Sequence, residues 1–88
     1  MKIKDGFMLR EVAGQCVVIP LGERVVEFNG IMTLSESGAL LWKSLEKDVT
    51  DDELLSILLK EYSVDEEIAK ADVREFVTAL KEKGLLVG

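Results

Sequence analysis

The spacing of hydrophobic residues changes once along this chain, close to residue 34. Upstream of that point, apolar and polar residues alternate with the period of two that is typical of strands. This pattern predicts a hairpin in which residues 7–12 pair with 15–20. A further strand is predicted over 31–34, and residues 24–28 form either a fourth strand or an irregular approach to it. The N-terminal part therefore predicts a small antiparallel sheet of three or four strands.

Downstream, apolar residues recur every three or four positions, which predicts three helices. The first covers about 36–46. The second begins at Thr50-Asp51-Asp52-Glu53, which has the form of a capping box. The third runs from about 65 to 83, and residues 85–87 add a short closing segment. Strands followed by helices predict an α+β fold, and the length allows one domain, residues 1–88.

The junction between the two parts joins the last strand directly to the first helix. Ser35 can accept a hydrogen bond from an amide of the first turn, and Glu36 is favoured at the positive end of the helix. Gly38 lets another element pack close to this turn.

Charge is distributed unevenly along the chain. The net charge of −6 comes from residues 35–88, which hold seven basic and thirteen acidic side chains. A nucleic-acid-binding surface needs Lys and Arg to displace counterions from phosphates, so this balance disfavours nucleic acid as a partner. No apolar run approaches the roughly 20 residues that span a bilayer, and no signal-peptide pattern is present. We therefore expect a cytoplasmic protein without a membrane partner.

Side chains able to perform chemistry are nearly absent. The chain has no histidine and a single cysteine, which excludes imidazole-based catalysis, a thiolate zinc site and an internal disulfide. Cys16 lies in an apolar run and is predicted to be a buried structural thiol. The acidic triplets 51–53 and 65–67 lie at predicted helix starts, where carboxylates stabilise the helix dipole, so we interpret them as caps rather than metal ligands. The sequence predicts a binding protein without enzymatic activity, cofactor or metal.

The third predicted helix has a broad apolar face with a basic border on one side and an acidic border on the other. The basic border, Lys70, Arg74 and Lys81, follows the edge of the face that Val73 and Val77 form. One interpretation makes the whole face a core stripe with solvated flanks. The other makes the Val73 and Val77 edge one wall of a peptide-binding groove.

The predicted strand at 31–34 carries no Lys, Pro or charge. Exposed strand edges usually carry such residues, because their unpaired backbone groups otherwise recruit other chains. An unprotected edge beside a helix is a good receptor for an extended peptide, since backbone pairing supplies affinity and side-chain pockets supply selection.

Several stretches together resemble the pyrroloquinoline quinone biosynthesis protein D (PqqD) family. They span almost the whole chain and comprise Leu9-Arg10-Glu11-Val12-Ala13-Gly14, the segment from Phe28 to Trp42, Tyr62-Ser63-Val64-Asp65, Ala71-Asp72-Val73 to Phe76, and Leu80 to Leu86. Where the family usually has Leu-Asn-Glu-Thr, this chain has Leu34-Ser35-Glu36-Ser37, and Ser retains the capping ability.

The resemblance implies a winged-helix-like module that recognises the leader of a ribosomally made precursor peptide. It implies delivery of that precursor to a modifying enzyme, a radical S-adenosylmethionine maturase, in the biosynthesis of pyrroloquinoline quinone or a related peptide-derived product. In the family, the leader adds as a strand to the edge strand before the first helix and lies against the third helix.

Carried over to this chain, the resemblance assigns peptide binding to one strand and one helix. The strand residues are Phe28, Ile31, Met32, Thr33 and Leu34, and the helix residues are Lys70, Val73, Arg74, Val77 and Lys81. Residues 24–28 are the fallback pairing strand. A basic border beside the groove would favour a leader with acidic residues.

Two other functions stay open. Three helices and a small sheet would permit a winged-helix nucleic-acid-binding protein, although the acidic charge argues against it. A structural module would instead form a homodimer by pairing residues 31–34 with their own copy.

Overall fold

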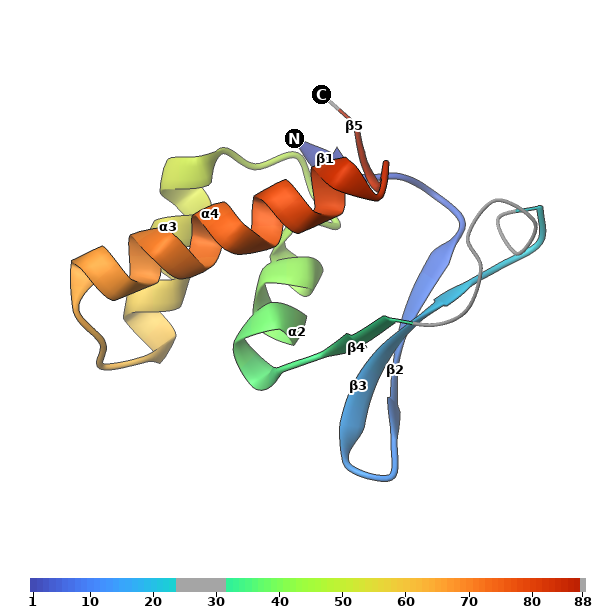
Figure 1. Ribbon diagram of the computed structural model, residues 1–88, viewed down its shortest axis with the longest axis horizontal. Coiled ribbons are helices and arrows are strands. Elements are labelled where there is room, and N and C mark those ends of the chain that lie inside the picture. Colours follow the sequence, from blue (N-terminus) through green and yellow to red (C-terminus); the bar gives the residue numbers. More distant parts are fainter. Residues whose placement is uncertain (24–31, 88) are drawn as a thin grey trace.

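The computed structural model describes residues 1–23 and 32–87. Within that part of the chain, a three-stranded antiparallel sheet precedes three helices, which confirms the predicted α+β fold (Figure 1). The sheet consists of β2 (Phe7–Val12), β3 (Gln15–Pro20) and β4 (Met32–Leu34). The helices are α2 (Glu36–Ser44), α3 (Asp51–Glu61) and α4 (Glu66–Glu82). Two further strands, β1 (Lys2–Ile3) and β5 (Leu86–Val87), pair as a separate ribbon.

The β2–β3 hairpin has the predicted strand boundaries. Its two-residue turn places Ala13 at φ 51° and Gly14 at φ 79°, the two positive φ values of a type I′ turn. β3 also pairs antiparallel with β4 and is therefore the central strand of the sheet. The possible strand at 24–28, with Phe28, and the predicted strand residue Ile31 lie outside the described residues.

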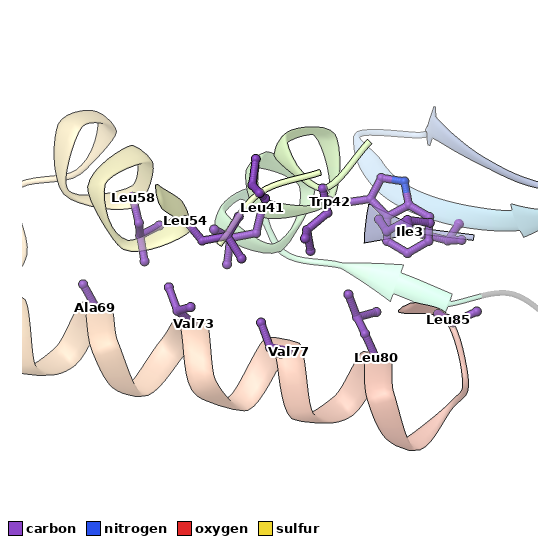
Figure 2. Close-up of a cluster of buried hydrophobic side chains, with 13 residues drawn as sticks. Ile3, Leu41, Trp42, Leu54, Leu58, Ala69, Val73, Val77, Leu80 and Leu85 are labelled. Carbon is purple, nitrogen blue, oxygen red and sulfur yellow. The ribbon is translucent and has the colours of Figure 1, made fainter. Parts of the chain in front are cut away.

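One face of the sheet and all three helices enclose the hydrophobic core (Figure 2). Leu9, Val18 and Met32 lie side by side on that face because they are register partners. The helices cover this face with large side chains, and burying each one contributes about 1.5–3 kcal/mol relative to leaving it exposed. The most deeply buried large side chains are Trp42, Leu41, Leu45, Leu54, Leu58, Leu80, Leu85 and Val18.

The first two helices begin at the side-chain caps that the sequence predicts. Ser35 Oγ accepts a hydrogen bond of 3.1 Å from the Gly38 N–H, and Ser35 is the single residue between β4 and α2. At α3, the Glu53 N–H donates to Thr50 Oγ1 at 3.2 Å and the Thr50 N–H donates to Glu53 Oε1 at 3.1 Å, which is the predicted capping box. These caps fix where the strand layer passes into the helical layer.

The β1–β5 ribbon closes the molecule beside the end of α2. Ile3 is buried, pairs with Leu86 and donates its N–H to the Leu45 carbonyl at 2.9 Å. The N-terminal ammonium donates to Asp48 Oδ1 at 2.7 Å. The sequence indicates a short closing segment at 85–87 but not β1, because a two-residue strand is too short to show a period.

Two other expectations can be compared with the structure. Cys16 is half-buried rather than buried, because it pairs with the exposed Glu11 toward the hairpin turn. In residues 1–23 and 32–87, no helix is both long enough and apolar enough to cross a membrane.

Candidate functional site

β4 is an edge strand with few of the usual protective features. In the described part of the chain it pairs with β3 on one side only. Its residues, Met32, Thr33 and Leu34, include no charge and no proline. In the view of Figure 1, α4 passes on the side of β4 away from the β2–β3 hairpin. The unpaired side of β4 is therefore positioned to accept another strand.

The backbone of Thr33 points toward this open side. In a two-residue type I′ hairpin the residues flanking the turn, here Val12 and Gln15, exchange both backbone hydrogen bonds, and the two kinds of pair then alternate. Val17, two positions further along, therefore directs its N–H and C=O toward β2. Its partner on β4 is Thr33, so the Thr33 N–H and C=O point away from the sheet. An added strand would find one donor and one acceptor at this residue.

A hollow of about 400 Å³ lies between the start of α2 and α4, next to the end of β4. Gly38 lies at this approach, where a Cβ atom built on its backbone would be in van der Waals contact with Phe76 Cε1 at 3.4 Å and with Leu34 Cβ at 3.5 Å. The Phe76 ring and the last residue of β4 therefore meet at the first turn of α2. The remaining lining residues include Leu41 and Ala79.

A second hollow, of about 360 Å³, continues from the first. Both are lined by Ser35, Ser37 and Asp72, and the second extends to Tyr62 and Val64. Together they form a groove, which we call the α2–α4 groove, that begins where β4 ends. Its position lets a peptide pair with β4 and place side chains against α4.

Helix α4 borders this groove with one of its two sides. The groove-facing border consists of Asp72, Glu75, Phe76 and Ala79. Phe76 and Ala79 are half-buried, whereas Asp72 and Glu75 are exposed. This border carries both apolar surface and negative charge.

The opposite border of α4 carries the basic residues that the sequence assigned to the site. Lys70, Arg74 and Lys81 line a separate hollow of about 290 Å³ against α3. Asp51 and Asp52, at the start of α3, line the same hollow. The basic border therefore faces α3, not the end of β4.

Val73 and Val77 lie between the two borders and belong to the core. Their exposed fractions are 4% and 5%, and they pack among the buried side chains that α2 and α3 contribute (Figure 2). The structure thus separates the predicted site residues: Met32, Thr33 and Leu34 form the edge strand that ends where the groove begins, whereas the five predicted helix residues lie in the core or on the α3 side.

Four residues of α4 line the groove but were not assigned to the site from the sequence, namely Asp72, Glu75, Phe76 and Ala79. Helical periodicity puts Phe76 and Ala79 on the edge of the apolar face opposite Val77, so the signal was present in the spacing. Periodicity does not show which edge of a helix faces a given strand. That choice depends on how α4 crosses the sheet.

The chemistry available at the groove is limited to backbone groups, hydroxyl groups, apolar surface and carboxylates. In the described residues, no group of three or more His, Cys, Asp or Glu side chains could hold a metal ion. Such a set of groups suits the binding of another chain.

The chain is similar to proteins of one family and to two solved structures. The sequence model described as "Coenzyme PQQ synthesis protein D (PqqD)" matches residues 7–86. The structure titled "TbiB1 in Complex with the TbiA(beta) Leader Peptide" is 30% identical with a TM-score of 0.77, and the match covers 100% of this chain and 96% of that one. The structure titled "Lasso peptide synthetase B1 complexed with the leader peptide" is 21% identical with a TM-score of 0.74, covers 99% and 96% of the two chains, and supports the fold alone. No curated protein matches this chain.

Proposed function

The chain belongs to the PqqD family, and from this premise we propose that it binds the leader segment of a ribosomally made precursor peptide by β-strand addition. The observation that carries the proposal is the open, uncharged edge of β4, with the Thr33 backbone pointing outward beside the α2–α4 groove. The 30% identical neighbour, TbiB1, is a complex with a leader peptide, which supports the same kind of ligand here.

In this proposal the leader lies about 4.7–4.9 Å beyond β4, the usual spacing of paired strands. It exchanges backbone hydrogen bonds with Thr33, and alternate side chains face α4. Phe76 and Leu34 meet at Gly38, so a leader side chain on that face packs against Phe76. The backbone contacts provide affinity for any extended peptide, and the groove provides selection.

The domain acts as a carrier of the precursor rather than as a catalyst. It presents the bound precursor to a modifying enzyme, and we propose a radical S-adenosylmethionine maturase in that role. The family description, which names coenzyme PQQ synthesis, supports a product of the pyrroloquinoline quinone type or a related peptide-derived product. A different type of modifying enzyme is the alternative. Co-purification of the tagged domain with the modifying enzymes encoded beside its gene distinguishes the two.

A proline at Thr33 tests strand addition directly. Thr33→Pro removes the outward N–H without removing a β3–β4 hydrogen bond, a position at which edge strands tolerate proline. We expect the Kd for the leader peptide encoded beside this gene to rise about tenfold, because one backbone hydrogen bond is lost and the ring hinders pairing. Isothermal titration calorimetry measures the change, and the urea unfolding midpoint verifies that the variant is folded.

The matched control is Glu11→Pro on β2. By the same alternation, Glu11 points its N–H away from β3, at the other edge of the sheet. This variant should bind the leader like the wild type. Equal affinity of Thr33→Pro and the wild type, or equal losses in both variants, would remove β4 as the docking edge. Amide shifts in an NMR titration provide a second readout, since residues 32–34 and 72–79 must respond to saturating peptide.

Self-association through β4 would use the same edge and would compete with the leader. Sedimentation with and without the peptide tests this relation: a dimer formed through β4 must dissociate when the leader binds. A dimer that persists at saturating leader uses another surface.

A further inference from the structure

We propose that the leader places a Lys or Arg side chain in the α2–α4 groove, with its charged end at Asp72 and Glu75. This inference rests on the proposed function and adds to it the chemistry of the segment that is selected. It reverses the expectation from the sequence, where the basic border of α4 favoured an acidic leader.

The first observation is the sign of the charge along the groove. Glu36, Asp72 and Glu75 line its two hollows, and no Lys or Arg lines either one. Asp72 and Glu75 are three positions apart on a helix, so their side chains are neighbours and one cation reaches both. The carboxylates do not make the site by themselves. The open β4 edge and the groove do so, and the carboxylates set which side chain is preferred.

The second observation is that these carboxylates have no cation in the described part of the chain. The ion pair found there joins the N-terminal ammonium to Asp48, and neither Asp72 nor Glu75 takes part in one. Lys83, the residue that follows α4, lines neither hollow of the groove. A basic residue of the leader would therefore not have to displace a partner from within the described residues.

The positive end of the α2 dipole reduces the negative field of the groove carboxylates only slightly. A helix N-terminus carries roughly half a positive charge. At α2, the Gly38 N–H already donates a hydrogen bond of 3.1 Å to Ser35 Oγ. Three carboxylates outweigh that half charge. The groove therefore keeps a negative field after the helix dipole is included.

The third observation is the apolar surface next to the carboxylates. Leu41, Phe76 and Ala79 line the same hollow as Asp72 and Glu75. Lys and Arg have a long aliphatic stem and a charged end, so the stem packs on this surface while the charge reaches the carboxylates. The Phe76 ring also attracts a cation above its face. A long cationic side chain matches both parts of the hollow better than a short polar one.

The experiment compares leader binding by the wild-type chain and by D72N/E75Q, which keeps the side-chain shapes and removes two charges. The probe is the leader peptide of the precursor encoded beside this gene, measured by calorimetry. We expect the Kd to rise about fivefold, the size expected for two solvent-exposed ion pairs. The difference should shrink at high salt, because exposed charges are screened.

The matched control is E46Q/E61Q, which removes the same number of carboxylates outside the groove. It should bind the leader like the wild type, since the net charge changes equally but the groove does not. On the peptide side, each Lys or Arg of the leader is replaced by Gln in turn. One replacement should weaken binding to the wild type about fivefold and leave binding to D72N/E75Q unchanged, as in a double-mutant cycle.

The outcomes separate this inference from the proposed function. If the wild-type chain does not bind the leader, strand addition itself is wrong. If it binds and D72N/E75Q binds equally well, the basic side chain in the groove is wrong while strand addition stands. A loss of affinity on reversing Lys70, Arg74 and Lys81 to Glu, with none in D72N/E75Q, would also overturn the inference and return the basic border to the site.

Discussion

At the scale of single residues, Gly38 joins the fold to the site. A Cβ atom at this position would lie 3.2 Å from Ser35 Oγ, closer than most side chains tolerate, and 3.4 Å from Phe76 Cε1, at the limit of ordinary contact. Alanine gains up to about 1 kcal/mol of helix propensity over glycine, which offsets this crowding. Valine adds two methyl groups in the same space and cannot avoid both neighbours. The absence of a side chain at Gly38 thus allows the cap, the ring and the end of β4 to meet.

Gly38→Val should therefore destabilise the fold by about 2 kcal/mol, as overpacking usually does. It should also weaken leader binding, because Phe76 must shift out of the groove. Urea unfolding measures the first effect and calorimetry the second. Ser56→Val is the control, since Ser56 is exposed on α3 and the same new side chain there should change stability by less than about 0.5 kcal/mol. Equal losses in the two variants would show that Gly38 has no special packing role.

At the scale of elements, the capping box holds the start of α3. Thr50→Ala removes the oxygen that accepts the Glu53 N–H and should cost about 1 kcal/mol, whereas Thr50→Ser should retain most of the stability. Asp65, at the start of α4, makes no side-chain cap hydrogen bond, so Asp65→Ala should cost less than Thr50→Ala. Urea midpoints with unchanged m-values measure all three. A larger loss for Asp65→Ala would mean that charge, not the hydrogen bond, dominates these helix starts.

The same elements show what local sequence patterns determine. The hairpin ends, the Thr50 cap and the extent of α4 follow from short-range rules, because turn chemistry, caps and periodicity depend on neighbouring residues. Short-range rules do not determine which side of α4 faces the end of β4. Both borders of α4 flank one apolar face, and the packing of α4 against α2 and α3 decides that Phe76 rather than Val77 reaches the groove. The predicted strand residues 32–34 therefore lie next to the start of the groove, whereas the predicted helix residues lie elsewhere.

At the scale of the whole molecule, the groove depends on segments that are far apart in the sequence. The start of α2, which follows β4, forms one side, and residues 72–79 of α4 form the other. The β1–β5 ribbon then joins the two ends of the described chain, and Ile3 connects it to the end of α2 through the Leu45 carbonyl. Such long-range contacts leave no local pattern in the sequence. The sequence therefore predicts the closing segment at 85–87 but not its partner strand, β1.

The ion pair between the N-terminal ammonium and Asp48 predicts a contribution to folding stability that depends on pH. The hydrogen bond from the N-terminal ammonium, and then its charge, hold the pKa of Asp48 below its usual value of 3.8. A carboxyl whose pKa is lowered by folding stabilises the fold above its unfolded-state pKa, and this contribution disappears as the pH falls through the folded-state pKa.

Asp48→Asn should therefore lower the urea midpoint slightly at pH 7 and match the wild type once the pH is well below 3.8. N-terminal acetylation should cause at least this loss at pH 7, because it removes the ammonium charge and also alters the group that donates to the Val49 carbonyl at 2.9 Å. Glu46→Gln is the control, because that exposed carboxylate forms no ion pair with a described residue. If the urea midpoints of Asp48→Asn and the wild type differ by the same amount at pH 7 and at pH 2, the ion pair contributes nothing to stability.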